Sequence, residues 1–479
     1  MGLAIPHRRE RGNRFWWFLI ALVGTGLLIW QWQGYRQARA YLAPGTTLGG
    51  ISVSGLSPDE AVERVTTAYS APVLLHYEET TIPLYPEEVA FRINWETTRA
   101  ALEEAHARAG GVRGFLAHLF RRPPPAAHVP IEATYSEEAL RDFLSLVAQQ
   151  YDRDPEPPRP VVAELKLAPG EPGTRLKVEA ALPLVTQALY SPDEREVTLP
   201  VEVTPPPPAS LEMVGELIQA RAADFPGVVS VFVKDLQTGE ELALNAEVAY
   251  AGMSIVKVAI VEEFFRYLDR APNVEETKLL TETLTLSGNF TANLLLREIG
   301  EGDAYRGAER VTESMHRLGL VNTFIAVPYE AEMVPPTIVT PANSRTDINT
   351  QPDPAMQTTP LDMGMLLEMI YQCSRGGGTL LALYPNELTP EECGMQLEIM
   401  KQNKINSLIE VGIPPDTPLA HKHGWIGDTH ADAGIVFSPQ GDFVLVIYLY
   451  NPGWLEWEQS APLISDIATA VYNYFNPPG

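Results

Sequence analysis

The sequence predicts a mixed α/β chain whose largest domain, residues 210–479, is an α+β fold with one antiparallel sheet. Runs typical of strands lie near both ends of this domain: VVSVFVKDL and LALNAEV near its start, then HGWIGD, DAGIVFS and FVLVIYLY near its end. A mainly helical stretch, 254–401, separates the two groups. We therefore expect both ends of the domain to form one sheet beside a helical subdomain. Small α+β modules and one transmembrane helix are expected before it.

Charge and cysteine content limit the classes of function. The 479 residues carry a formal net charge of −26, of which residues 1–40, with six arginines and one glutamate, contribute +5, which leaves −31 for residues 41–479. A nucleic-acid-binding protein needs a basic face, so no nucleic-acid partner is expected. The sequence has only two cysteines, Cys373 and Cys393, which are too few for a Cys-rich zinc site. They are either bridged or separately buried. The histidine spacing matches no metal motif, so neither a metal nor a cofactor is expected.

Residues 15–33 form an uncharged apolar stretch that predicts a transmembrane helix. Its length is near the lower limit for spanning hydrocarbon, and tryptophans lie at both ends, as in an interfacial belt. Four arginines precede it and two follow, so residues 1–14 should form a cytoplasmic basic tail. The alternative is a signal peptide cleaved after residues 38–40, with a secreted product. Both interpretations place residues 41–479 outside the cytoplasmic membrane.

Proline marks the domain boundaries of the exported part. Residues 121–208 hold 17 of the 42 prolines, which favour stiff spacers, and boundaries are expected near 121–130, 151–160 and 203–210. Residues 204–209 are the predicted linker. Residues 41–203 should form an α+β region in which 131–203 partly repeats the order of 41–120. The expected helices begin at Ser57 and Ser136 and span 95–109 and 178–189, and the expected strands span 72–77, 80–84, 161–167 and 197–203.

The N-terminal region resembles the peptidoglycan-binding domain of bacterial envelope proteins related to the vancomycin-resistance accessory protein. The matching stretches are PGTTLGGISVSGLSPDEAVERV at 44–65 and PGEPGTRLKVEAALPLVTQAL at 169–189. The resemblance implies that residues 41–203 bind the glycan of the cell wall. The alternative is a spacer that lifts the C-terminal domain off the membrane.

Three short motifs carry the candidate chemistry. Ser254 and Lys257 are spaced i, i+3, which puts a hydroxyl and an amine one helical turn apart at the start of an apolar helix. Burial among Ile, Val and Ala would lower the pKa of Lys257 and make it a better base toward Ser254. A hydroxyl and an amide follow in the segment 287–289. A strand lysine beside a glycine, at 422–424, would let a substrate backbone approach closely.

The order and spacing of these motifs resemble the class A β-lactamase and penicillin-binding superfamily. Ser254-x-x-Lys257 is followed 33 residues later by Ser287-x-Asn289, and 135 residues further by Lys422-x-Gly424, as in the S-x-x-K, S-D-N and K-T-G motifs of that family. The resemblance covers essentially all of residues 210–479. It implies a class A β-lactamase-like fold and a serine hydrolase without a cofactor.

The resemblance also implies roles for single residues. Ser254 would be the acylated nucleophile, Lys257 its partner in proton transfer, and Ser287 the proton donor to the leaving nitrogen. The implied substrate-binding residues are Asn289, Lys422, His423, Gly424 and Ile426. The backbone N–H of Ser254 would form half of the oxyanion hole, and the second donor is expected after Gly424, at Ile426.

The sequence departs from the family pattern at three points. Gly288 replaces the loop-bracing Asp of S-D-N, and His423 replaces the hydroxyl residue of K-T-G, which should alter specificity. The family's glutamate that activates the deacylating water is missing where a gap-free count puts it, near Asn343. Asp347 and Asp353 are the first candidates for this base. Glu330 or Glu332 would replace them if the loop is longer, and a fourth interpretation is that no base exists.

The sequence is compatible with three functions. The first is a membrane-anchored serine hydrolase that acts on β-lactam amides or on D-alanyl peptides of the cell wall. The second is a penicillin-binding-like peptidoglycan enzyme with slow or absent deacylation. The third is a non-catalytic wall-binding protein, which the retention of Ser254, Lys257, Ser287, Asn289 and Lys422 argues against.

Overall fold

A computed structural model describes residues 13–108, 110–268 and 270–478, and most of the predicted cytoplasmic tail lies outside them. The chain divides into two compact units. The first comprises Met1–Glu156 and Pro172–Pro205, and the second comprises Pro157–Glu171 and Pro206–Gly479. Helices and strands mix in both units, so the predicted mixed α/β class is confirmed.

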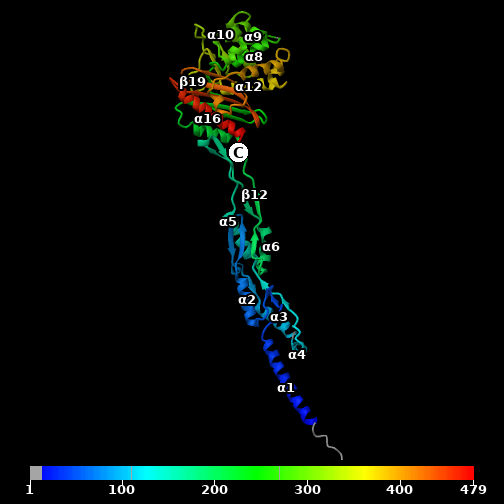
Figure 1. The fold of residues 1–479 in the computed structure, drawn as a ribbon. Helices are drawn as coiled ribbons and strands as arrows, with labels where there is room; N and C mark the ends of the chain where they lie inside the picture. Colours follow the sequence, from blue (N-terminus) through cyan, green and yellow to red (C-terminus); the bar gives the residue numbers. More distant parts are fainter. Residues whose placement is uncertain (1–12, 109, 269, 479) are drawn as a thin grey trace, which may run out of the picture. The chain divides into compact units, whose positions relative to one another are not determined.

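The first unit begins with the long helix α1, Asn13–Ala38 (Figure 1). Its segment Phe15–Ala38 is long and apolar enough to cross a membrane, and its apolar side chains are exposed. In water such a surface would be costly, at about 25 cal/mol for each Å² of apolar area. This helix is therefore compatible with a membrane anchor and with a signal sequence.

The rest of the first unit is a set of short strands and helices around its own core. Its further helices are α2 Pro58–Ser70, α3 Trp95–Arg108, α4 Gly111–Leu119, α5 Glu137–Tyr151 and α6 Val178–Leu189. Its strands are β1 Thr47–Leu48, β2 Ile51–Ser52, β3 Val73–Tyr77, β4 Thr80–Leu84, β5 Arg92–Ile93, β6 His128–Val129, β7 Ala133–Thr134, β10 Gly173–Leu176, β11 Glu196–Thr198 and β12 Val201–Thr204. The expected N-terminal cap of α2 is present, because the Ser57 hydroxyl accepts from Glu60 N at 3.3 Å.

Two predicted strands are each divided in the structure. The stretch 161–167 forms a hairpin of β8, Arg159–Val161, and β9, Lys166–Ala168. The stretch 197–203 is split at Pro200, because proline cannot donate to a strand ladder, and its halves pair with different partners, β3 and β10. The β8–β9 hairpin belongs to the second unit, where Asn473 donates a hydrogen bond to Leu165 O at 2.9 Å.

The second unit contains the predicted antiparallel sheet formed by both ends of the domain. The strand order is β14-β13-β20-β19-β18, so strands from the start of the domain pair directly with strands from its end. The bounds are β13 Val228–Asp235, β14 Glu241–Leu244, β18 Leu419–Trp425, β19 Thr429–Ser438 and β20 Gly441–Tyr450. The eight-residue pairing of β13 with β20 joins the two ends, and β18 is left as an edge strand.

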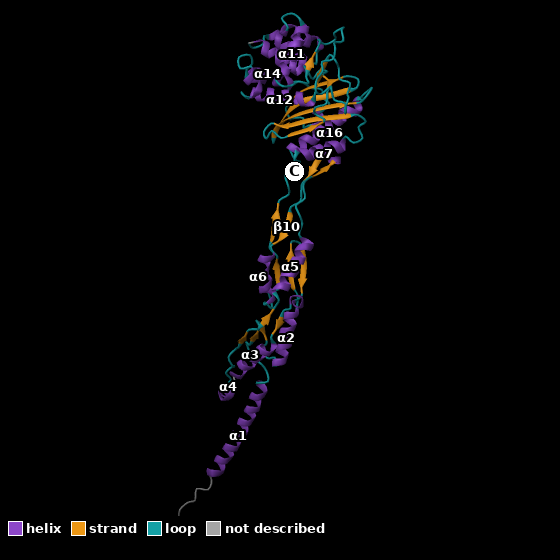
Figure 2. Cartoon of the chain, turned by 180° about the vertical axis from the view of Figure 1, so that it is seen from behind, coloured by secondary structure: helices purple, strands orange, loops and turns teal. Residues whose placement is uncertain are grey.

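Helices cover both faces of this sheet (Figures 1 and 2). On one face pack α7, Leu211–Arg221, and α16, Trp457–Phe475. Residues of β20 alternate between the two cores: Leu445 and Ile447 join the core under α7 and α16, whereas Val446 and Tyr448 join the core on the helical side. A strand covered on both faces needs apolar residues at every position, which explains the run FVLVIYLY.

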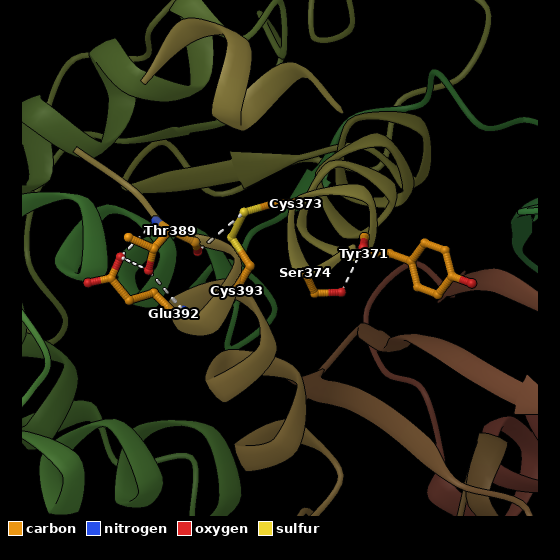
Figure 3. Close-up of a disulfide and its surroundings, with 6 residues drawn as sticks. All are labelled: Tyr371, Cys373, Ser374, Thr389, Glu392 and Cys393. Atoms are coloured by element: carbon orange, nitrogen blue, oxygen red, sulfur yellow. Dashed lines mark hydrogen bonds between the residues drawn. A yellow bond between two sulfur atoms is a disulfide. The ribbon is translucent and has the colours of Figure 1, made fainter. Parts of the chain in front are cut away.

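The helical subdomain lies against the other face. Its helices are α8 Lys257–Leu268, α9 Val274–Thr285, α10 Asn289–Ile299, α11 Ala304–Arg317, α12 Pro360–Ser374, α13 Gly378–Leu383 and α14 Pro390–Met400, whereas the short α15, Ile409–Gly412, packs against α16 on the first face. A three-stranded sheet of β15 Tyr250–Ala251, β17 Met356–Thr358 and β16 Phe324–Ile325 precedes α8 and α12. Cys373 of α12 and Cys393 of α14 form a disulfide, beside the Thr389–Glu392 cap that begins α14 (Figure 3).

Candidate active site

Ser254 lies in the turn that leads from β15 into α8. The Gly252 carbonyl accepts two backbone hydrogen bonds that close this turn. Met253 adopts a left-handed conformation with φ of 49°, which costs roughly 1 kcal/mol or more for a residue with a side chain. The Tyr329 hydroxyl donates to Met253 O at 2.7 Å and holds this strained residue in place. Ser254 itself remains partly exposed, so substrate can reach its hydroxyl.

Lys257, the first residue of α8, is the centre of the site. Its ammonium donates hydrogen bonds to Ser254 Oγ at 2.9 Å, Ser287 O at 2.6 Å and Asn289 Oδ1 at 2.8 Å. The Ser287 hydroxyl lies 3.4 Å from the same nitrogen. The Tyr329 ring covers it, with 4.6 Å between Nζ and the ring centroid. The structure thus brings Ser254, Lys257, Ser287 and Asn289 together around one nitrogen.

Burial prepares Lys257 for proton transfer. Its side chain is fully buried, and desolvation lowers its pKa to about 8, although the charge of Glu330 acts in the opposite direction. An amine with a pKa near 8 is neutral in a substantial fraction of molecules at physiological pH. A neutral Lys257 beside Ser254 Oγ has the position and the basicity to accept its proton.

The loop 286–288 presents Ser287 and Asn289 without the aspartate of the family motif. Ser287 is left-handed, with φ of 59°, and its carbonyl is the acceptor of the shortest Lys257 bond. A Cβ on Gly288 would lie 2.6 Å from Thr291 Oγ1. The Thr291 hydroxyl donates to Gly288 O at 3.1 Å and accepts from Thr283 at 2.9 Å. Two threonines therefore brace the loop in place of the aspartate.

Lys422 supplies a second buried amine on the edge strand β18. Its Nζ donates to His423 O at 2.7 Å. Burial and, to a smaller extent, the positive charge of Lys257 lower its pKa to about 7, although the charge of Asp432 acts in the opposite direction. The effect of the Lys257 charge on Lys422 indicates that the two amines lie near each other. An anionic substrate group entering there would raise both pKa values and be held by both charges.

His423, which stands where the family has a hydroxyl residue, is a neutral and well-held ring. Burial and the nearby Lys422 charge lower its pKa to about 4. Asn403 Nδ2 lies 3.2 Å from His423 Nδ1, which assigns the ring proton to Nε2. The ring also stacks on Trp425, with 5.2 Å between centroids and 12° between planes. His423 is therefore a neutral donor rather than a cation at pH 7.

Gly424 brings β18 against the nucleophile. A Cβ at this position would lie 3.0 Å from the backbone nitrogen of Ser254 and 3.1 Å from Met253 Cβ. A side chain here would therefore require Ser254 or β18 to shift by a few tenths of an ångström, which favours glycine. The edge of β18 and the Ser254 N–H therefore lie next to each other, as an oxyanion hole requires.

The second oxyanion donor cannot be Ile426 as predicted. The Ile426 N–H donates to Thr429 O at 2.9 Å and closes the β18–β19 turn. In an antiparallel ladder, residues that bond to the neighbouring strand alternate with residues that point away from it. Since Ile426 bonds to β19, the N–H of Trp425 points to the open edge, toward the side where Gly424 meets Ser254. The N–H of Trp425 is therefore better placed for this role than that of Ile426.

The structure places a different carboxylate beside the site from the two aspartates that the sequence predicts. Asp347 pairs with Arg345 at 2.6 Å, and Asp353 accepts from Ala355 N at 2.8 Å. Within the described residues, neither aspartate hydrogen-bonds to Ser254, Lys257 or Asn289. Asn289 Nδ2 instead donates to Glu330 Oε1 at 3.0 Å. The two predicted aspartates are therefore replaced by Glu330 as the carboxylate next to the site.

Tertiary contacts that the sequence did not reveal place Glu330. Asn293 of α10 donates to Tyr329 O and accepts from Tyr329 N, both at 2.9 Å. This reciprocal pair fixes the backbone just before Glu330, which is left-handed with φ of 60°. Asn293 lies four residues after Asn289, on the same face of α10. This spacing is the feature of the sequence that could have indicated a role for Asn293 beside the site.

A family profile matches the domain that contains this site. The profile of the beta-lactamase enzyme family matches residues 213–274 and 271–475, which is more than half of the chain. The chain therefore belongs to the beta-lactamase enzyme family, and residues 206–479 are a class A β-lactamase-like, serine hydrolase-like domain. No curated protein matches the chain.

Among solved structures, PBP-A is 21% identical with a TM-score of 0.44, over 57% of this chain and 99% of that one. A beta-lactamase from Desulfarculus baarsii is 17% identical with a TM-score of 0.44, over 56% of this chain and 100% of that one. The TLA-1 extended spectrum beta-lactamase is 17% identical with a TM-score of 0.42, over 56% of this chain and 99% of that one.

Proposed function

We propose that this protein is a membrane-anchored, extracytoplasmic serine hydrolase that β-lactam amides or D-alanyl peptides acylate at Ser254. The observation that carries the proposal is the buried Lys257 amine, which lies 2.9 Å from Ser254 Oγ and within hydrogen-bonding distance of Ser287 and Asn289. A structural lysine would have no reason to be held, desolvated, against the partly exposed hydroxyl of Ser254.

Acylation begins when neutral Lys257 accepts the Ser254 proton. The Ser254 oxygen then forms a bond to the substrate carbonyl carbon, and the backbone N–H groups of Ser254 and Trp425 stabilise the oxyanion. One such donor is worth roughly 3 kcal/mol in comparable sites. The carbon–nitrogen bond breaks as the proton passes from Lys257 through the Ser287 hydroxyl to the leaving nitrogen. Lys422 and His423 bind the substrate carboxylate.

Glu330 is the proposed base for deacylation. Its carboxylate takes a proton from a water molecule, whose oxygen forms a bond to the acyl carbon. The bond from that carbon to Ser254 Oγ then breaks, and Ser254 Oγ takes a proton from Lys257, which regains one from Glu330. The Asn289 amide holds this carboxylate at 3.0 Å from its nitrogen. If Glu330 does not activate water, the acyl-enzyme persists and the protein acts as a penicillin-binding-like enzyme.

Incubation with a fluorescent penicillin and a chromogenic cephalosporin tests this function. Sustained colour with transient labelling supports hydrolysis, and a long-lived label without turnover identifies the penicillin-binding-like enzyme. The Ser254→Ala variant, which removes only the nucleophilic oxygen, is the matched control. Wild-type protein that behaves like Ser254→Ala with both reagents would exclude the proposed β-lactam chemistry.

The proposed cellular location follows from the first unit and the disulfide. The segment Phe15–Ala38 supports an uncleaved anchor with the N-terminus in the cytoplasm, and the Cys373–Cys393 bridge is typical of an oxidising compartment. We further propose that residues 41–203 dock the enzyme on cell-wall glycan. Co-sedimentation of the full chain with purified, teichoic-acid-free cell wall tests the docking, and the size of the membrane-bound chain distinguishes an anchor from a cleaved signal.

A further inference from the structure

Helix α4 in the first unit carries an uncovered apolar face. Val112, Leu116, Leu119 and Phe120 are 74%, 46%, 39% and 71% exposed. Their spacing of four, three and one residues puts them on one side of the helix. Each of these side chains therefore leaves a substantial part of its surface exposed. An exposed aromatic and aliphatic stripe of this kind marks an interaction surface.

Contacts with α1 fix the position of this stripe. The Phe115 ring of α4 lies 5.0 Å from Trp32 and 5.6 Å from Tyr35, between ring centroids. The Tyr35 hydroxyl donates to Gly111 O at 3.3 Å, which ties the start of α4 to the same helix. Trp32 is the last tryptophan of the apolar stretch of α1, where a spanning helix meets the lipid headgroups. Helix α4 is therefore held at the level of the lipid headgroups.

A basic cavity of about 310 Å³ lies between the end of α1 and helices α3 and α4. Its charged or titratable lining residues are Arg39, His106, Arg108, Arg113, His118 and Arg122. No carboxylate is among the described residues that line it. Arg108 pairs with Glu104, whereas Arg39, Arg113 and Arg122 have no ion-pair partner in the described chain. Unpaired guanidinium groups around a cavity favour a phosphate.

The local charge contrasts with the rest of the exported chain. Residues 105–125 contain four arginines and no acidic residue, although residues 41–479 together carry −31. Elsewhere the acidic surface would be repelled by anionic lipid. A second copy of the chain is a less suitable partner for α4, because symmetric pairing would bring the same arginines together.

We propose that α4 is an interfacial helix that docks on the outer surface of the bilayer, with the phosphate of an anionic phospholipid in the basic cavity. The inference rests on the proposed membrane anchor. The apolar stripe enters the acyl-chain boundary beside α1, and the cavity arginines bind headgroup phosphates. This contact fixes the start of the exported chain to the membrane surface.

Spin labels on the full chain in nanodiscs test the position of α4. The two native cysteines are bridged, so Leu116→Cys carries the only reactive thiol. The matched control is Leu146→Cys on α5, which is 63% exposed in the same unit. We expect the label at 116 to be accessible to oxygen and protected from an aqueous nickel chelate, and the label at 146 to show the reverse. Equal access of the nickel chelate to both labels would overturn the proposal.

Lipid binding tests the cavity. Native mass spectrometry of the full chain in detergent, with phosphatidylglycerol against phosphatidylcholine, should show preferential retention of phosphatidylglycerol. Arg113→Gln with Arg122→Gln should weaken this retention by about fivefold for each arginine. The control pair, Arg64→Gln with Arg92→Gln, removes two exposed arginines of the same unit elsewhere and should leave retention unchanged.

Each contrary result has a distinct meaning. Equal loss in both arginine pairs, or spin–spin broadening that shows two labels at 116 in contact, contradicts lipid docking and favours general charge or a second copy. Displacement of the lipid by an equal concentration of inorganic phosphate shows a free-phosphate site instead. A chain that does not remain in nanodiscs overturns the anchor as well, whereas a retained chain with a water-exposed label at 116 overturns only the docking of α4.

Discussion

Glu330 accepts a hydrogen bond from the Asn289 amide at 3.0 Å, although 41 residues separate the two in the sequence. The same Asn289 side chain accepts a hydrogen bond from Lys257 at 2.8 Å. One amide therefore joins the amine proposed for acylation to the carboxylate proposed for deacylation. Both proposed half-reactions would depend on a single arrangement of three side chains.

Removal of the Glu330 carboxylate should separate the two half-reactions. Glu330→Gln keeps a hydrogen-bonding group of the same size but cannot accept a proton from water. General-base catalysis typically contributes about 10²–10⁴-fold, so deacylation should slow by that amount while acylation persists. Rapid-quench mass spectrometry would show the acyl-enzyme accumulating. Glu332→Gln, two residues away, is the control, and an equal loss in both variants would show that Glu330 has no specific role.

The acylation rate should rise with pH as Lys257 loses its proton. Because burial lowers the pKa of Lys257 to about 8, its neutral, basic form grows as the pH rises through 8. The second-order rate of penicillin labelling, measured from pH 6 to 9, should follow this titration. Lys257→Ala should lower the rate by roughly 10²–10⁴-fold and abolish the inflection. A wild-type rate that is flat across this range contradicts the role of Lys257 as base.

Gly424 should be essential for activity but not for folding. In Gly424→Ala, the new Cβ would lie 3.0 Å from Ser254 N, which moves β18 away from the nucleophile. Displacing one oxyanion donor should slow acylation by roughly 10–10²-fold, somewhat less than outright removal. Gly394→Ala on α14, where nothing lies within 4 Å of a new Cβ, is the control. Normal acylation by a folded Gly424→Ala protein would rule out the proposed oxyanion hole.

Glu262 should make the second unit less stable at high pH. Both of its carboxylate oxygens are buried without a hydrogen-bond partner in the described chain. Burial, then the charge of Glu263, raises its pKa, so the folded state keeps a proton that the unfolded state loses above pH about 4.3. Stability is therefore lost as the pH rises from that value toward the folded-state pKa.

The Glu262→Gln variant checks this sign. It should match the wild type near pH 4 and unfold at a higher temperature than the wild type at pH 8, as calorimetry can measure. Glu313→Gln, an exposed glutamate of α11, should show no such difference. A Glu262→Gln protein that is less stable than the wild type at pH 8 would mean that the ionised carboxylate has a stabilising partner.

The disulfide should stabilise the helical subdomain rather than act in catalysis. Cys373 and Cys393 are 20 residues apart. Closing a loop of that size lowers the conformational entropy of the unfolded chain, which raises the free energy of unfolding by about 3 kcal/mol. The double variant Cys373→Ala with Cys393→Ala should unfold at lower denaturant and keep its acylation rate. Reductant should destabilise the wild type to the same degree and leave the variant unchanged. Equal stability of wild type and variant would indicate that the bridge is absent in solution.

Local patterns were sufficient for much of the site. Ser254 and Lys257 are one helical turn apart, so their contact follows from spacing alone, although α8 begins at Lys257 rather than at Ser254. The β20 sequence FVLVIYLY likewise predicts a strand, and it forms one. In these cases the residues that decide the structure are neighbours in the chain.

The remaining features depend on tertiary contacts. A gap-free count placed the deacylating base near Asn343, whereas the loop that follows Glu330 is longer and the Asn293–Tyr329 pair holds its start. The proposed oxyanion donor is Trp425 rather than Ile426, because the register of β18 with β19 decides which N–H groups bond to β19 and which point to the open edge. The sequence does not specify this register. The stretch 161–167, predicted as one strand, forms part of a hairpin that belongs to the second unit.

The mass of the protein during reaction with benzylpenicillin is the most direct test of the central claim. We expect an adduct on the peptide that contains Ser254. Its mass should equal one whole penicillin, since ring opening leaves the nitrogen attached. The adduct should form and decay in the wild type, persist in Glu330→Gln and be absent from Ser254→Ala. An adduct on another residue, or none in the wild type, would contradict the account.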